Sequence, residues 1–161
     1  MKALSDAQVA GIYTGKITNW KEVGGRDAAI TVVNPKKGYS SAELFTHYFK
    51  IDYEDIKADI IAGDNPTRIK AVIADPNAIA YISAGEADRT ARAGVPIKLL
   101  PFNNVMPTGR NIITGNYPIT RPLILVTKNL PSRAVKAFID FCLSQAVVDL
   151  IEKLDFVPYE D

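Results

Sequence analysis

Runs of β-branched and apolar residues of strand length alternate with helical patterns along most of the chain, and this alternation restricts the fold more than any other feature. The expected strands are residues 29–33, 78–82, 97–100 and 122–127. The expected helices are residues 5–14, 40–49, 65–74 and 86–93, with a closing helical stretch from 131 to about 154 that is interrupted near Ser144. Such alternation predicts one layered α/β domain over residues 1–161.

Capping signals mark two of the expected helix starts. Ser5 precedes Gln8 by three residues, and Ser40 precedes Glu43 by three, which is the spacing of a capping box. Gly94 follows the expected helix 86–93 and can adopt the left-handed conformation that ends a helix. We therefore expect Ser5 and Ser40 to be N-cap residues.

Charge and cysteine content exclude several kinds of partner and site. Nineteen basic residues face eighteen acidic ones, so the formal net charge of +1 gives no support to a nucleic-acid or anionic-membrane partner. The single cysteine, Cys142, excludes an intrachain disulfide and a cysteine-built metal site, and we expect it to be buried. Met1 and Lys2 run directly into the first helix signal, which predicts either a cytoplasmic protein or an export signal upstream.

Signatures of enzymes are missing from the sequence. There is no G-x-S-x-G, G-x-G-x-x-G or H-E-x-x-H pattern, and Thr14-Gly15-Lys16 lacks the first glycine and the final Ser/Thr of a phosphate loop. The only histidine, His47, is expected on the polar face of a helix without a nucleophile or metal partner. The prediction is a protein that is not an enzyme, with no catalytic residues, no metal and no cofactor.

One segment has the character of an anion site. Residues 33–43 run from a strand through a loop into a helix N-terminus, where free N–H groups and the helix dipole favour an anion. The candidate ligand-binding residues are Lys36, Lys37, Gly38, Tyr39, Ser40 and Ser41. The alternative is that Ser40 only caps the helix and that the lysines are solvated.

The stretch from Val135 to Ile151 is apolar on most of its circumference. Its polar residues form only narrow strips, at Lys136, Asp140, residues 144–145 and Asp149. A helix that is apolar on most sides must be covered on most sides. The stretch is therefore expected to pack against more protein than its own neighbours provide.

Three segments resemble phosphate-binding proteins of ABC transporters. Residues 4–20, LSDAQVAGIYTGKITNW, resemble the family pattern LS-x-x-Q-x-x-x-I-(F/Y)-x-G-K-I-T-N-W. Residues 75–81, DPNAIAY, resemble T-P-G-A-I-G-Y, and residues 117–123, YPITRPL, resemble Y-P-I/L-x-R-P-L. The order and spacing of the segments fit the family from residue 4 nearly to the end.

The resemblance implies a periplasmic or extracellular, two-lobed receptor, of which this chain is one lobe with a type II periplasmic-binding-protein-like fold, a mixed sheet flanked by helices. Residues 4–118 resemble the second lobe, and residues 119–161 resemble the strand and helices that return to the first lobe. The N-terminal region that builds most of that first lobe lies outside these 161 residues. The implied ligand is phosphate or a similar oxyanion held by hydrogen bonds rather than by a metal, and the implied partners are the membrane subunits of an ABC transporter.

The anion-binding loop departs from the family pattern Arg-x-x-Gly-Ser-Gly-Thr. Pro35 stands where the family has arginine, and Gly38 is kept. Tyr39, Ser40 and Ser41 replace the serine, the second glycine and the threonine. Lys36 or Lys37 could restore the charge but not the bidentate geometry of a guanidinium. We therefore expect weak oxyanion binding at the helix N-terminus, with a ligand-free protein-interaction module as the alternative and homo-oligomerisation in either case.

Overall fold

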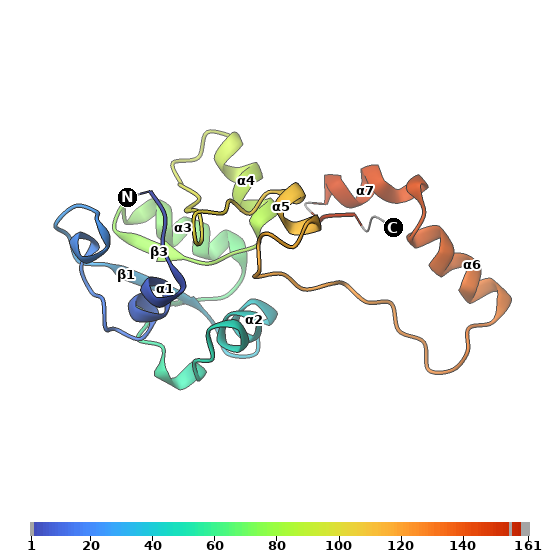
Figure 1. Ribbon diagram of the computed structural model, residues 1–161, viewed down its shortest axis with the longest axis horizontal. Coiled ribbons are helices and arrows are strands. Elements are labelled where there is room, and N and C mark those ends of the chain that lie inside the picture. The colour runs from blue at the N-terminus through green and yellow to red at the C-terminus, as the bar shows by residue number, and fades with distance from the viewer. Residues whose placement is uncertain (1, 155, 159–161) are drawn as a thin grey trace.

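A computed structural model describes residues 2–154 and 156–158 and has an α/β architecture (Figure 1). The elements in chain order are α1 (Asp6–Tyr13), the 3₁₀ helix η1 (Trp20–Val23), β1 (Thr31–Pro35), α2 (Ser40–Phe49), η2 (Tyr53–Asp55), β2 (Ile60–Ala62), α3 (Asn65–Ala74), β3 (Ala78–Ala80), α4 (Ala84–Arg92), α5 (Gly109–Ile113), α6 (Arg133–Cys142), η3 (Gln145–Val147) and α7 (Val148–Lys153). No helix among the described residues is long and apolar enough to cross a membrane.

The sheet is small and parallel, with the strand order β2-β1-β3. Val33 of the central strand pairs with Ile60 on one side, and Val32 pairs with Ile79 on the other. Helix α2 connects β1 to β2 and α3 connects β2 to β3, as parallel strands require a crossover. The predicted α/β class is confirmed, and the described strands are all parallel where we expect a mixed sheet.

The core is built around β1 and an aromatic cluster. Val33 is fully buried, and Tyr13 of α1 packs on Phe45 of α2 with ring centroids 4.6 Å apart. Phe45 also stacks on Tyr81, just after β3, at 4.1 Å. Buried aromatic rings contribute large apolar areas, and pairs of this kind add to the stability of a core. The cluster thus fixes α1 and α2 against the strands.

One of the two predicted capping boxes forms. The Ser5 side chain accepts from the Gln8 N–H while the Gln8 side chain accepts from the Ser5 N–H, as expected. The predicted capping box at Ser40 does not form, because Tyr39 occupies the N-cap position and Ser40 is already helical. Gly38 has a left-handed backbone conformation, at φ 84°, and the next residue, Tyr39, has the extended conformation of an N-cap. The helix therefore begins one residue earlier than a cap at Ser40 would place it.

Two predicted strands do not form. Residues 97–100 and 122–127 lie outside every strand of the sheet, whereas the short strand β2 was not predicted from the sequence. In the second segment Leu123, Ile124 and Val126 are 71%, 73% and 84% exposed. A strand needs a hydrogen-bonded neighbour, and no strand described here pairs with residues 122–127. Their apolar sequence therefore stays uncovered.

The C-terminal helices project from the α/β body at the end of this long extended segment (Figure 1). The predicted interruption near Ser144 is confirmed, because α6 ends at Cys142 and η3 begins at Gln145. Phe138 and Phe141 of α6 are 61% and 53% exposed. Cys142 is half-buried rather than buried, because α6 is covered only in part: all its other residues except Ile139 are exposed.

Candidate functional site

Loops that follow all three strands meet at one edge of the sheet, because parallel strands end on the same side. A cleft of about 790 Å³ opens there and extends under residues 96–102. Its polar lining includes Ser40 and Ser41 of α2, Arg68 of α3 and Ser83 after β3. In open α/β sheets this edge is where ligands generally bind.

The six predicted site residues do not all lie in this cleft. Ser40 and Ser41 line it, whereas Lys36, Lys37, Gly38 and Tyr39 are exposed on the loop beside it. The Lys37 ammonium forms an ion pair with Glu54 of η2, and this pairing raises the pKa of Lys37. Lys37 therefore already has a counter-charge beside it, at the exposed surface of the loop.

The N-terminus of α2 offers unpaired backbone donors to the cleft. The Tyr39 carbonyl accepts from the N–H groups of Ala42 and Glu43 at 2.8 and 3.1 Å, which leaves the N–H groups of Ser40 and Ser41 without an acceptor among the described residues, and no side chain caps the helix. The first N–H groups of any α-helix have no intrahelical acceptor, and the helix dipole makes this end positive. The arrangement suits an oxyanion.

Arg68 is a residue of this site that the sequence did not reveal. It lies on α3, is 2% exposed, and its guanidinium joins all three loops. Nη1 donates to the Tyr81 carbonyl at 2.6 Å and to Ser41 Oγ at 3.2 Å, while Nη2 donates to Asn65 Oδ1 at 2.6 Å. The available signal was a lone arginine four residues before Val72, on the apolar face of a predicted helix.

Tyrosine hydroxyls hold the end of β1 next to the cleft. The Tyr81 hydroxyl donates to Asn34 Oδ1 at 2.8 Å, and the Tyr53 hydroxyl donates to the Pro35 carbonyl at 2.7 Å. Burial raises the pKa of Tyr81 well above its usual range, so this hydroxyl stays protonated and acts as a donor. Asn34, itself 1% exposed, is thereby satisfied inside the core.

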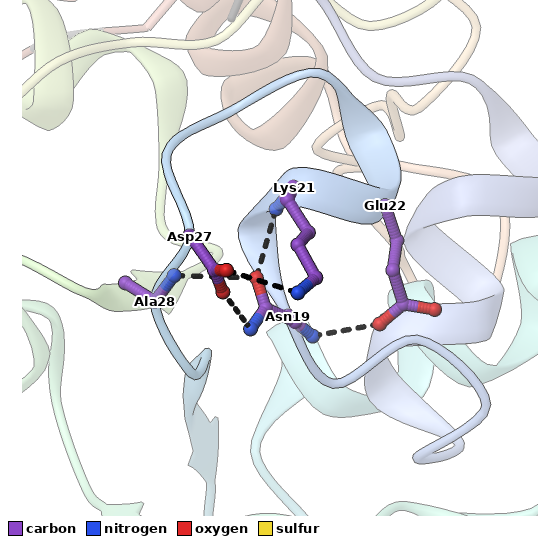
Figure 2. Close-up of polar contacts among 5 residues, drawn as sticks. All are labelled: Asn19, Lys21, Glu22, Asp27 and Ala28. Carbon is purple, nitrogen blue, oxygen red and sulfur yellow. Dashed lines mark hydrogen bonds and ion pairs between the residues drawn. The ribbon is translucent and has the colours of Figure 1, made fainter.

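The segment that carries the most specific resemblance is structural in this chain. Figure 2 shows Asn19 at its centre, where its Oδ1 accepts from the N–H groups of Lys21 and Ala28 at 3.0 and 3.2 Å. Its Nδ2 donates to Asp27 Oδ1 at 2.9 Å, and hydrogen bonds from Lys21 and Asn19 lower the pKa of Asp27. These contacts build a closed loop at η1, while Leu4, Val9, Tyr13 and Trp20 of the same motif contribute to the cleft lining.

A family model described as the PBP superfamily domain matches residues 1–146. The chain belongs to this superfamily. Among curated relatives, the phosphate-binding protein PstS of Borreliella burgdorferi is 33% identical over 162 residues, which is 96% of this chain and 57% of that protein. PstS of Bacillus subtilis is 30% identical over 163 residues, which is 100% of this chain and 52% of that protein. The chain thus spans little more than half the length of these relatives.

Solved structures agree with the superfamily assignment. A putative phosphate ABC transporter substrate-binding protein with bound phosphate from Clostridium perfringens superposes with a TM-score of 0.83 at 30% identity, covering 99% of this chain and 64% of that one. An ABC-type phosphate transport receptor from Vibrio cholerae gives a TM-score of 0.82 at 27% identity, covering 99% and 65%. The PBP-like fold and the resemblance to phosphate-binding proteins are confirmed.

Proposed function

We propose that this chain is the solute-binding part of an extracytoplasmic receptor that binds phosphate or a similar oxyanion and presents it to the membrane subunits of an ABC transporter. The observation that carries the proposal is the N-terminus of α2, which opens into the cleft with Ser40 and Ser41. The names of the relatives support phosphate as the ligand and an ABC transporter as the partner. The same relatives are binding proteins rather than enzymes.

Binding follows from hydrogen bonds and the helix field. The first N–H groups of α2 and the hydroxyls of Ser40 and Ser41 donate to the anion, and the dipole of α2 stabilises its charge. Gly38, Tyr39, Lys36 and Lys37 form the neighbouring loop, where the lysines add positive potential. No step of this binding needs a metal or a cofactor.

The affinity of these 161 residues alone is expected to be low. Residues 4–118 correspond to one lobe, and residues 119–161 correspond to the segment that returns to the other lobe. The chain therefore supplies one wall of a cleft that two lobes would close. Because of this incomplete enclosure, we expect a Kd on the order of millimolar or weaker. This corresponds to a binding free energy of about −4 kcal/mol or less favourable. Isothermal calorimetry that gives a micromolar Kd for the chain would contradict the single-wall site.

A substitution tests where the anion binds. Replacing Ser41 with Asp places a carboxylate at the N-terminus of α2, so phosphate binding should be lost through like-charge repulsion. Ser132→Asp is the matched control, because it makes the same change at the N-cap of α6, outside the cleft lining. Chemical shifts of the amides at 38–41 report binding during a phosphate titration. Equal binding by Ser41→Asp and the wild-type chain would refute this placement.

A second candidate function is a ligand-free protein-interaction module. Leu123, Ile124, Val126 and Phe138 favour it, because all four are more than half exposed on one continuous part of the chain. Apolar surface of this extent is typical of an interface. The phosphate titration separates the candidates, since a pure interaction module would show no shifts at residues 38–41.

A further inference from the structure

Arg68 is a buried charge without a counter-charge in direct contact. Its acceptors are the Tyr81 and Asp64 carbonyls, the Asn65 side-chain oxygen and Ser41 Oγ, all of them neutral. Within residues 2–154 and 156–158, no carboxylate forms an ion pair with it. Glu86 comes nearest through the hydrogen-bond network, because Oε2 accepts from Asn65 Nδ2 at 2.7 Å. Burial lowers the pKa of the guanidinium, which reflects the cost of holding this charge away from water.

The contact with Ser41 has a directional consequence. Ser41 Oγ accepts a hydrogen bond from Arg68 Nη1, so the hydroxyl hydrogen remains available to donate. No other residue in the described part of the chain accepts this hydrogen. Ser41 therefore presents to the cleft a donor that the adjacent guanidinium polarises.

We propose that Arg68 supplies the positive charge of the oxyanion site and orients the Ser41 hydroxyl to donate to the anion. This inference rests on the proposed oxyanion-binding function. It assigns to α3 the charge that the family resemblance places in the loop, where this chain has Pro35. An anion beside Ser41 would be the counter-charge that Arg68 lacks.

The loop lysines fit this role less well. Lys37 is already paired with Glu54, and both side chains are largely exposed to solvent, which screens their charge. Lys36 is exposed and lies outside the cleft lining. The charge of Arg68, in contrast, acts from a buried position next to the first turn of α2, where screening by water is weak.

Charge-altering variants of Arg68 test the proposal in a phosphate titration followed by amide shifts at residues 38–41. Arg68→Gln removes the charge and should weaken phosphate binding at least about tenfold, the size expected for loss of a charge-assisted interaction. Arg68→Lys keeps the positive charge but loses the planar guanidinium with its several donors. It should therefore bind phosphate more tightly than Arg68→Gln does. Lys70→Gln removes one charge from the exposed side of the same helix and should bind as the wild-type chain does.

The comparison of the lysine and glutamine variants separates charge from structure. If Arg68 only ties the loops together, the charge that Arg68→Lys keeps should bring no advantage, and equal weakening of both variants would overturn the proposal. A binding loss in Arg68→Gln no larger than in Lys70→Gln would also overturn it. Wild-type protein that shows no phosphate shifts at all would instead refute the proposed function, so the two failures are distinguishable.

A second measurement needs no variant and remains informative if Arg68→Gln does not fold. The Nε–Hε resonance of Arg68 in the wild-type chain should shift with the same phosphate dependence as the Ser41 amide. An unchanged Arg68 resonance while the Ser41 amide titrates would show that the anion does not sense this charge. Sodium sulfate and sodium chloride titrations at matched ionic strength control for general salt effects.

Discussion

At the scale of single residues, Asn19 shows how one side chain can organise a loop. It caps η1, its amide oxygen accepts from two backbone N–H groups, and its amide nitrogen holds Asp27 (Figure 2). Next to it, Trp20 is buried and donates from Nε1 to the Asn77 carbonyl at 2.9 Å. Two adjacent residues thus fix the chain entering β1 against the turn before β3.

Replacing Asn19 with Ala should destabilise the fold by about 1 kcal/mol or somewhat more, the usual cost of losing an N-cap side chain. Chemical denaturation of the variant and wild-type chains measures the difference. The Lys21→Gln variant is the control, because the Lys21–Asp27 pair is exposed and such surface pairs contribute little. If Asn19→Ala and Lys21→Gln were equally stable, the loop would not depend on the cap.

Sequence patterns predicted the site only in part, and the residues show why. Strand, loop and helix around residues 33–43 could be read from local signals, and so could the helix that carries Arg68. The contact between Arg68 and Ser41 spans 27 positions and depends on the packing of α3 against the sheet, which no local pattern encodes. The Ser40 capping box was misread because a single left-handed residue, Gly38, shifts the cap by one position.

At the scale of elements, short strands were the hardest to predict. Ile60–Ala62 has only three residues and forms a strand because β1 lies beside it. Residues 122–127 have a stronger strand sequence and yet form none, since no neighbouring strand is described for them. Strand formation depends on the partner, whereas α1 and α3 carry their own start signals in Ser5 and Asp64.

The turn between β1 and α2 depends on the left-handed conformation of Gly38. Gly38→Ala should cost about 1 kcal/mol, because φ is 84° there and an L-residue is strained in that region. Gly109→Ala is the matched control, since an added Cβ meets nothing within 4 Å at either position. Of these two glycines, only Gly38 has a positive φ. Thermal unfolding compares the two variants. An equal effect at both positions would argue against strain at the turn.

At the scale of the whole molecule, the C-terminal part lacks cover. Leu123, Ile124 and Val126 lie on an unpaired extended segment, and Phe138 and Phe141 follow on α6 (Figure 1). The prediction from sequence that residues 135–151 require more protein around them agrees with this exposure. This chain covers 57% and 52% of the lengths of two relatives, and the family resemblance implies that the N-terminal region outside these 161 residues is one source of cover.

A second copy of the chain is another source of cover, and we expect self-association. Removing apolar surface from water is worth about 25 cal/mol per Å², which favours a dimer once association costs are exceeded. Light scattering on a sizing column should give a multiple of 17.6 kDa at high micromolar concentration. Phe138→Glu should shift the chain toward the monomer, whereas Lys136→Glu, on the same helix, should not. A wild-type chain that stays monomeric would contradict this expectation.

The central claim is that an oxyanion binds at the N-terminus of α2, and anomalous diffraction locates such an ion directly. Arsenate has the shape and charge of phosphate and scatters anomalously, so crystals soaked at tens of millimolar, well above the expected Kd, should show it. The account predicts an anomalous peak within hydrogen-bond distance of Ser41 Oγ and the first N–H groups of α2. Peaks found only at other arginine or lysine side chains, or no peak at all, would contradict it.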